Sequence, residues 1–406
     1  MSNQKTTNSV PQQQYYNTII HPADMGGCGH YRMKFPAMAA QTMRKDIRIV
    51  ESTKMIPLPE FYRDIRMVRV QRQVSSMQCK FLMEFLKPLS MQYGFWLVYE
   101  IDDVIGPDDI PMYNMGRQAY QFPDVDKNIR MMLNCVDFVT VTTERLKQYY
   151  HENYDVPNDN IIVLHNYLPR WWIGEAFHKD SIALRYDENK KKPRIAIASS
   201  TTHFDVNNLN GGIDDFSHVV DFIRDTVDKY QWIFIGGCPQ QLEDLVAEKK
   251  IELHRGSDLL NYPRELVGKN IDIIVAPLLD NIFNRSKSNI KFLEMSALGI
   301  PCICQDLTPY QKYTDLLFTD ANDLQNQIDR VLRNKKQYLK IVNGNRNIID
   351  YGNSESPNGW WLEKNMNVWL EQFMIPQKTL SYDVRPKAIK QKQQEAEKVV
   401  FNRGTK

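Results

Sequence analysis

Three charged residues in the second half of the chain have the types and the spacing to bind a phosphorylated ligand. Lys287, Lys291 and Glu294 follow one another at intervals of four and three residues, which predicts one shared helix face. Two lysines in the first turns of a helix oppose its dipole unless an anion is bound there. A carboxylate further along the same helix can accept hydrogen bonds from ribose hydroxyls. A solvated charged face with a Lys–Glu ion pair is the alternative.

The residues around this helix predict a strand–helix–strand unit. The apolar run 271–279 before the lysines is typical of a buried strand. Gly299 ends the helix, and residues 300–304 begin a second short strand. Open α/β sheets bind ligands at the carboxyl ends of their strands, so this position favours ligand binding over a solvated face.

A pair of aspartates follows the mostly apolar predicted strand 95–101. Asp102 and Asp103 would face a cleft at the end of that strand, because unpaired charge is costly in the core. Adjacent like charges raise the apparent pKa of such a pair, which suits one member for general-base work. Arg72, at the end of a neighbouring predicted strand, would neutralise the pair or hold a phosphate. Capping by the aspartates and a surface position for Arg72 remain alternatives.

Glycine-rich and hydroxyl-rich loops open both halves of the chain. The glycines of residues 22–32 do not fit GxGxxG, so a dinucleotide fingerprint is not supported. They would still let a ligand or a facing domain approach the backbone, although an ordinary turn needs glycine too. The loop 199–205 offers hydroxyls and backbone N–H groups to an anion. The candidate residues from these loops and from two further strand ends are Gly27, Gly29, His30, Tyr31, Arg32, His165, Ser199, Ser200, Thr201, His203 and Gly236.

Composition limits the classes of function. The chain has 406 residues, 42% apolar and 25% charged, which is typical of a soluble globular protein with two domains. Its net charge of +2 is too small to indicate nucleic-acid binding, although residues 385–406 carry seven basic and two acidic side chains. The six cysteines show no CxxC pair and no metal-ligand spacing. With no signal peptide and no membrane-length apolar run, we expect reduced thiols, a cytoplasmic location and no membrane segment.

Apolar runs alternate with helix-like segments along most of the chain. The predicted strands are residues 17–21, 48–51, 67–71, 95–101, 137–142, 161–164, 194–198, 232–235, 251–254, 271–276 and 301–304. The longer predicted helices are residues 75–93, 124–134, 144–150, 214–230, 324–333, 335–347 and 360–373. This alternation favours parallel sheets covered on both faces. Because the pattern breaks at residues 169–192, we expect two Rossmann-like α/β domains facing a cleft.

The segment 271–306 resembles the nucleotide-sugar core of GT-B glycosyltransferases, particularly the retaining group with a Glu-x7-Glu motif. The second Glu of that motif, which binds the donor ribose, matches Glu294, whereas the first falls at Ser286. The usual contact of that first Glu to the donor sugar is therefore missing, and we expect backbone groups of Asn284 or Ser286 to replace it. Ser288 is a further candidate for donor binding. Residues 26–29 are similar to the family's glycine loop. Residues 99–103 resemble the Glu-Ile-Asp-Asp sequence at the sheet edge of several bacterial and phage glycosyltransferases.

This resemblance implies a glycosyltransferase that uses a UDP-sugar and needs no bound metal or other cofactor. Helix-terminal N–H groups and the two lysines would stabilise the leaving diphosphate. The family's last helix crosses back onto the first domain, as residues 360–373 would do here. The expected organisation is a disordered arm (1–14), an acceptor domain (15–168), a nucleotide-sugar domain (169–350), the crossing helix (351–375) and a basic tail (376–406).

The acceptor is predicted from a second resemblance. The Asn/Lys/Met-rich composition and residues 21–32 look like a T4-type phage protein, and such phages glycosylate hydroxymethylcytosine in their DNA. This implies an arabinosyl- or glucosyltransferase with UDP-arabinose or UDP-glucose as donor, double-stranded DNA as partner, and a monomer or weak dimer in the host cytoplasm. Candidate phosphate contacts are Arg63, Arg66, Arg69, residues 190–192 and the tail. A polysaccharide or lipid-linked acceptor, or non-catalytic nucleotide or nucleic-acid binding, are the alternatives.

Overall fold

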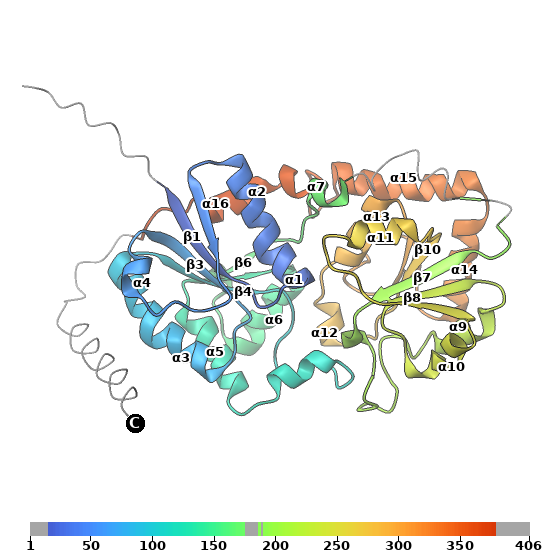
Figure 1. Cartoon of the computed structure of the whole chain (residues 1–406), viewed down its shortest axis with the longest axis horizontal. Coiled ribbons are helices and arrows are strands. Elements are labelled where there is room, and N and C mark those ends of the chain that lie inside the picture. The colour runs from blue at the N-terminus through green and yellow to red at the C-terminus, as the bar shows by residue number, and fades with distance from the viewer. Residues whose placement is uncertain (1–14, 175–185, 188–189, 379–406) are drawn as a thin grey trace, which may run out of the picture.

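The structure is a computed structural model that describes residues 15–174, 186–187 and 190–378. Two α/β domains lie side by side, each built around a six-stranded parallel sheet (Figure 1). The expected arm at residues 1–14 and all but the first three residues of the basic tail lie outside the described residues, as does part of the joint near residues 175–189.

The first sheet has the strand order β2-β1-β3-β4-β5-β6. Its strands are β1 (Tyr16–His21), β2 (Ile47–Glu51), β3 (Ile65–Gln71), β4 (Trp96–Ile101), β5 (Phe138–Val141) and β6 (Ile161–Val163). Its helices are α1 (Gly27–Gly29), α2 (Phe35–Met43), α3 (Ser76–Phe81), α4 (Lys87–Tyr93), α5 (Val125–Cys135) and α6 (Glu144–Tyr154). Turns of π-helix at His30–Lys34 and Leu82–Leu86 join α1 to α2 and α3 to α4.

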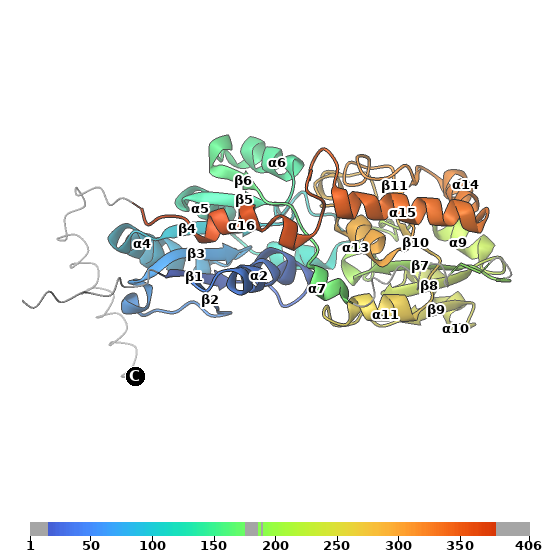
Figure 2. The ribbon, with the colours of Figure 1, turned by 90° about the horizontal axis from the view of Figure 1, so that it is seen from above.

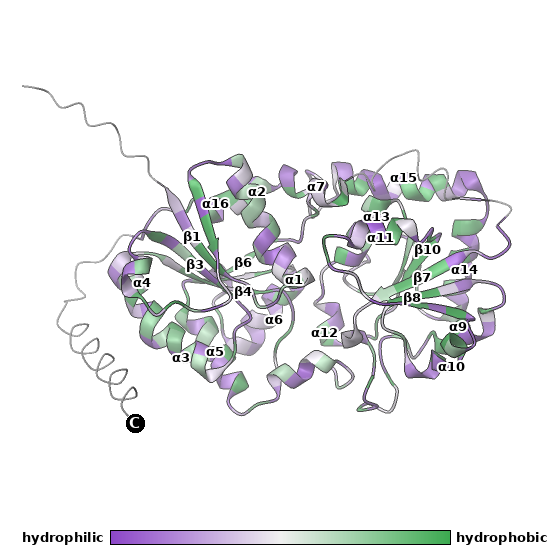
Figure 3. Ribbon diagram, in the orientation of Figure 1, coloured by the Kyte–Doolittle hydropathy of each residue, from purple (hydrophilic) through white to green (hydrophobic). Residues whose placement is uncertain are grey.

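The second sheet has the strand order β12-β11-β10-β7-β8-β9. Its strands are β7 (Arg194–Ser199), β8 (Gln231–Gly236), β9 (Ile251–His254), β10 (Ile273–Ala276), β11 (Cys302–Gln305) and β12 (Leu317–Phe318). Its helices are α9 (Val220–Thr226), α10 (Glu243–Ala247), α11 (Tyr262–Gly268), α12 (Ile282–Arg285), α13 (Ile290–Leu298), α14 (Ala321–Leu332) and α15 (Lys335–Tyr351). Apolar residues dominate the inner strands of both sheets because helices cover both faces (Figure 3).

The last helix, α16 (Met366–Phe373), lies on the first domain, whereas α15 lies on the second (Figure 2). The chain returns through a short bridge between Leu168 and Trp361, just before α7 (Arg170–Ile173). Trp369 of α16 is 1% exposed, and its ring lies 5.5 Å and 5.0 Å from the guanidinium groups of Arg32 and Arg69. The chain from α15 to α16 therefore packs on both domains and connects them.

Two predicted helices begin later than expected. The helix predicted from residue 214 begins at Val220, because the carboxylate of Asp214 accepts hydrogen bonds from the backbone N–H groups of Asp205 and Phe216. Such side-chain bonds compete with helix formation. Residues 360–365 are not part of the final helix, since the Asn365 amide donates to the carbonyl of Gly359 and holds a turn instead.

Candidate active site

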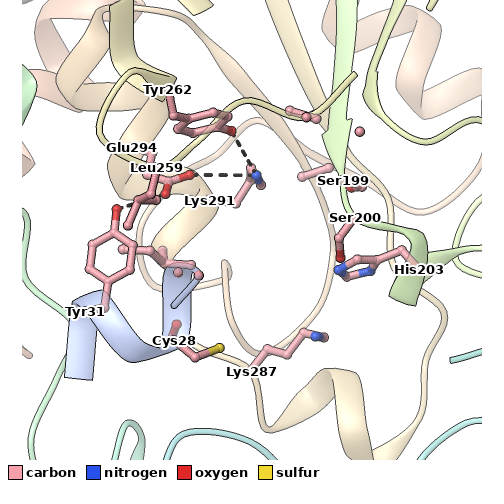
Figure 4. Close-up of a pocket in the computed structure, with 18 of the residues that line it drawn as sticks. Cys28, Tyr31, Ser199, Ser200, His203, Leu259, Tyr262, Lys287, Lys291 and Glu294 are labelled. Atoms are coloured by element: carbon pink, nitrogen blue, oxygen red, sulfur yellow. Dashed lines mark hydrogen bonds and ion pairs between the residues drawn. The ribbon is translucent and has the colours of Figure 1, made fainter. Parts of the chain in front are cut away.

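A cavity of about 630 Å³ lies between the domains, at the carboxyl ends of strands from both sheets. It is the position where open α/β sheets bind their ligands. The predicted residues that line it are Gly27, Tyr31, Arg32, Asp102, Asp103, Ser199, Ser200, Thr201, His203, Gly236, Lys287, Ser288, Lys291 and Glu294. Side chains from regions far apart in the sequence thus meet around one space (Figure 4).

Lys287 and Lys291 both reach the cavity, but they do not share a helix as the sequence predicted. The chain between β10 and β11 forms α12 and then α13, with Lys287 in the connection between them. The hydroxyl of Ser286 donates to the carbonyl of Ile282, a bond that disfavours continued α-helix. Lys287 consequently lies just before the N-terminus of α13, with its ammonium 3.9 Å from Asp103. Lys291 lies in the first turn.

Glu294 is held by groups from both domains. Its Oε1 accepts a 2.9 Å hydrogen bond from the hydroxyl of Tyr31, and its Oε2 lies 3.7 Å from the ammonium of Lys291. Lys291 also donates to the hydroxyl of Tyr262 at 3.3 Å. These four side chains line one wall of the cavity (Figure 4). The wall carries hydrogen-bond acceptors and a positive charge side by side.

Burial changes the charge properties of this wall. It raises the pKa of Glu294 above the usual carboxyl value, although Lys291 and Tyr31 oppose the change. Burial also lowers the pKa of Lys291, but Tyr262 and Glu294 outweigh that effect and hold its pKa above the ordinary lysine value. Lys291 therefore remains a fixed positive charge, which suits a phosphate contact.

The glycine turn after β1 also lines the cavity. The carboxylate of Asp24 accepts hydrogen bonds from the backbone N–H groups of Gly26 and Gly29, at 2.8 Å and 3.1 Å. A Cβ on Gly29 would lie 1.9 Å from the carbonyl oxygen of Asp24, so only glycine fits there. A Cβ on Gly27 would meet no atom within 4 Å, and this residue lines the cavity. Gly29 shapes the turn, and Gly27 leaves room for a ligand.

Asp102 and Asp103 are adjacent, but their surroundings shift the pKa of their carboxyls in opposite directions. Burial raises the pKa of Asp102, yet Arg72, 3.1 Å away, and Cys28 outweigh it and hold this pKa below the usual value. Burial raises the pKa of Asp103, and Asp102 raises it further, while Lys287 only partly opposes them. Asp103 is also the more exposed, with 22% of its side chain accessible against 8% for Asp102. Asp103 is the better placed of the two for proton transfer.

The loop after β7 supplies hydroxyls and an imidazole. Ser199, Ser200, Thr201 and His203 line the cavity, and Nδ1 of His203 lies 2.6 Å from Oδ2 of Asp215. Gly236 at the end of β8 has φ of 103°, and a Cβ there would lie 2.3 Å from the carbonyl of Ser199. Only glycine therefore allows β8 to end this close to the loop.

Six of the predicted residues do not line the cavity: Gly29, His30, Arg72, His165, Asn284 and Ser286. Arg72 is bound between Asp24 and Asp102. His165 and His30 are hydrogen-bonded through Nδ1 to backbone carbonyls. The buried amide of Asn284 donates to Asp215, and Ser286 is fully buried. These six residues therefore lie outside the cavity lining.

Several cavity residues were not predicted from the sequence. Cys28, Asn166, Ser257 and Tyr262 line the cavity, and Asp215 lies directly behind His203. Cys28 lies within the glycine turn that the sequence singled out, and Asn166 follows His165, so position alone could have found both. Nothing in the sequence near Asp215 or Tyr262 indicates that they reach this space.

Two further observations concern classes of ligand and location. Across the described ranges, the structure contains no group of three His, Cys, Asp or Glu side chains that would hold a metal ion. Within the same ranges, no helix has the length and apolar character needed to cross a membrane.

The sequence matches no family model and no curated protein. Solved structures share its fold. A glycosyltransferase from Rickettsia africae is 14% identical, with 90% of this chain and 100% of that chain covered and a TM-score of 0.56. HepE from Anabaena, in complex with UDP and glucose, is 11% identical over 89% of this chain and 99% of its own, with a TM-score of 0.57.

An alpha-glucosyltransferase in complex with UDP-glucose and DNA containing an abasic site is also similar. It is 9% identical over 88% of this chain and 99% of its own, with a TM-score of 0.56. At such identities the similarity defines the fold. The chain has the two-domain GT-B fold of these glycosyltransferases, which confirms the fold class predicted from the sequence.

Proposed function

We propose that the protein is a glycosyltransferase that moves a sugar from a UDP-sugar to an acceptor hydroxyl. The observation that carries this proposal is that Lys287, Lys291 and Glu294 of the second domain line one interdomain cavity together with the glycine turn of the first. A nucleoside diphosphate has the matching chemistry, with an anionic diphosphate and ribose hydroxyls. The similar structures that hold UDP or UDP-glucose also support the proposal of a UDP-sugar as donor.

Each cavity wall has a distinct role in this proposal. Lys287, Lys291 and the N-terminus of α13 neutralise the diphosphate, which gains charge as the sugar leaves. Glu294 accepts hydrogen bonds from the ribose. Asp103 takes the proton of the acceptor hydroxyl, because burial raises the pKa of its carboxyl toward the working pH of a general base. No obligatory cofactor is needed beyond the UDP-sugar itself.

For the acceptor we propose 5-hydroxymethylcytosine in double-stranded DNA, with an arabinosyl or glucosyl group transferred. Two arguments support it: the resemblance of the chain to T4-type phage proteins, and the shared fold with an alpha-glucosyltransferase that was solved with DNA. A modified base inside a duplex must leave the base stack to reach a cavity of this kind. A polysaccharide or lipid-linked acceptor is the competing proposal, because a shared fold does not determine the acceptor.

The phosphate contacts predicted for DNA need correction. Arg69 is 1% exposed and forms a 2.8 Å ion pair with Glu100, so it cannot reach DNA. Lys190 is paired with Asp272 at 2.6 Å. Arg63 is exposed and remains a candidate, whereas Arg66 donates to Gln377.

The test is UDP release from UDP-glucose and UDP-arabinose, with hydroxymethylcytosine DNA, with unmodified DNA, with an oligosaccharide and with no acceptor. Release stimulated only by the hydroxymethylated DNA, with sugar found on the base by mass spectrometry, supports the whole proposal. Transfer to the oligosaccharide alone contradicts the DNA acceptor but keeps the glycosyltransferase. No release with any acceptor from either donor contradicts the use of these UDP-sugars.

DNA binding has its own measurement. Affinity for the duplex should fall steeply as salt rises, because phosphate contacts release counterions. An affinity that stays constant between low and physiological salt contradicts the DNA acceptor and leaves the donor site unaffected.

A further inference from the structure

The second domain contributes a histidine–carboxylate pair to the cavity. His203 lies at the end of the loop after β7, with 21% of its side chain exposed, and lines the cavity beside Ser200 (Figure 4). Asp215 lies behind it with 1% exposed. Nδ1 of His203 is 2.6 Å from Oδ2 of Asp215, which leaves Nε2 on the opposite edge of the ring. Within the described residues, Nε2 has no hydrogen-bond partner.

Three donors fix the carboxylate of Asp215. Its Oδ1 accepts hydrogen bonds from the hydroxyl of Tyr113 at 2.7 Å, the backbone N–H of Leu279 at 2.9 Å and the amide of Asn284 at 2.6 Å. Burial raises the pKa of Asp215, but His203, the backbone N–H of Leu279 and the hydroxyl of Tyr113 outweigh it and keep this pKa below the usual value. An ionised carboxylate only accepts hydrogen bonds, so Nδ1 of His203 carries the hydrogen. The ring is thus oriented as the histidine of a catalytic dyad.

An anion bound in the cavity would change the charges around His203. Burial lowers the pKa of His203, Lys287 and Lys291 lower it further, and Asp215 raises it. The aspartates of the first domain, Asp102 and Asp103, line the same space. A diphosphate bound between the lysines would cancel their repulsion and add negative charge beside Nε2. The imidazole would then lie between two anions, which favours its protonated form.

We propose that His203 is the general acid that protonates the departing diphosphate, with Asp215 as the residue that positions it. This inference rests on the proposed function and adds a catalytic group to it. The bond between C1 of the sugar and the diphosphate oxygen breaks, and its electron pair stays on that oxygen, which takes the proton from Nε2. The acceptor oxygen forms the new bond to C1 and gives its proton to Asp103. Solvent returns a proton to His203 and removes one from Asp103.

The first test measures proton uptake when UDP binds. Calorimetric titration of UDP at about pH 8, in buffers of different ionisation enthalpy, should show a net uptake of protons by the wild-type protein. His203→Gln should still bind UDP but lose this uptake. His218→Gln is the matched control, since His218 is held by Gln305 at 2.7 Å and does not line the cavity, and it should behave as the wild type.

The second test measures turnover against pH. In the wild-type protein kcat should fall at alkaline pH, because the acid must be protonated in the donor complex. His203→Gln should lower kcat by about 10²- to 10⁴-fold and remove this alkaline decline. A purely structural His203 would change stability without changing the shape of the profile.

The outcomes separate this inference from the proposed function. UDP binding to the wild-type protein without proton uptake overturns the role of His203 and leaves the donor site standing. An unchanged alkaline decline in His203→Gln does the same. Absence of UDP binding by the wild-type protein overturns both. The uptake experiment on the wild type needs no variant, so it decides the question even where His203→Gln fails to fold.

Discussion

The hydroxyl of Tyr31, on the first domain, donates a 2.9 Å hydrogen bond to the carboxylate of Glu294, on the second. The residue proposed to bind the donor ribose is therefore held in position by the opposite domain. Its second oxygen lies 3.7 Å from Lys291 and remains available to a ligand hydroxyl. Donor binding and the contact between the two domains consequently share one side chain.

Replacing Glu294 by glutamine should weaken UDP binding by about 10- to 100-fold. A hydrogen bond to a charged acceptor contributes roughly 1.5–3 kcal/mol. The glutamine amide is neutral and keeps only one acceptor oxygen in place of the two carboxylate oxygens. Calorimetric titration of UDP measures the change. Glu265→Gln, at an exposed position on α11, is the matched control and should bind UDP as the wild type does. Equal affinities for all three proteins would remove Glu294 from the donor site.

Replacing Asp103 by asparagine should abolish most turnover while donor binding is retained, because the amide cannot accept the acceptor's proton. Asp102→Asn should have a milder effect on turnover, since Asp102 is engaged by Arg72. Since burial raises the pKa of Asp103, the rise of turnover with pH should occur above the ordinary range of aspartate. Kinetics for both variants across pH check this. Equal, mild effects would exclude both aspartates from the chemistry.

The same two variants should have opposite effects on stability. The pKa of Asp102 is below its usual value in the folded protein, so its ionised form stabilises the fold above the unfolded pKa of about 4. That stability is lost as pH falls through the folded pKa. Asp102→Asn should therefore cost about 1–3 kcal/mol at pH 7 and little at a pH below the folded pKa of Asp102.

Asp103 has the reverse sign, because its folded pKa is raised and its charge opposes folding above that value. Asp103→Asn should be at least as stable as the wild type at pH 7. Urea unfolding at several pH values measures both effects. A loss of stability for Asp103→Asn equal to that for Asp102→Asn would contradict the opposite environments of the two carboxylates.

Trp369 should be required for the attachment of α16 to the first domain. Its ring faces two buried arginines, Arg32 and Arg69, which share a single carboxylate, that of Glu100. Trp369→Leu should lower the free energy of unfolding by about 2–4 kcal/mol, through lost packing and lost cation–π attraction. Trp171→Leu is the control, because Trp171 is 45% exposed, and should cost less than about 1 kcal/mol. Equal losses would contradict the proposed attachment.

Much of the fold was predictable because each inner strand is a short apolar run that alternates with a helix-forming segment. The exceptions are local. The donor helix was predicted as one piece because Lys287, Lys291 and Glu294 have helical spacing, but Ser286 bonds back to Ile282 and the chain turns before α13. Short side chains that compete for backbone groups are hard to distinguish from helical ones by periodicity.

The site was predictable only where a single segment carries the signal. Lys291 and Glu294 are close in sequence, and so are Asp102 and Asp103. Asp215, by contrast, meets its partner Tyr113 only when the two domains assemble, and no local pattern marks either residue. Contacts that depend on how the two domains are arranged cannot be predicted from local patterns in a single sequence.

The account depends most directly on the binding of UDP between the two lysines and Glu294. Titration of UDP into the wild-type protein and into the double variant Lys287→Ala/Lys291→Ala tests it, with Lys336→Ala at an exposed position as control. The account predicts one saturable site in the wild type and in the control, and a loss of at least about 100-fold in the double variant. No UDP binding by the wild type, or equal affinity in the double variant, would contradict it.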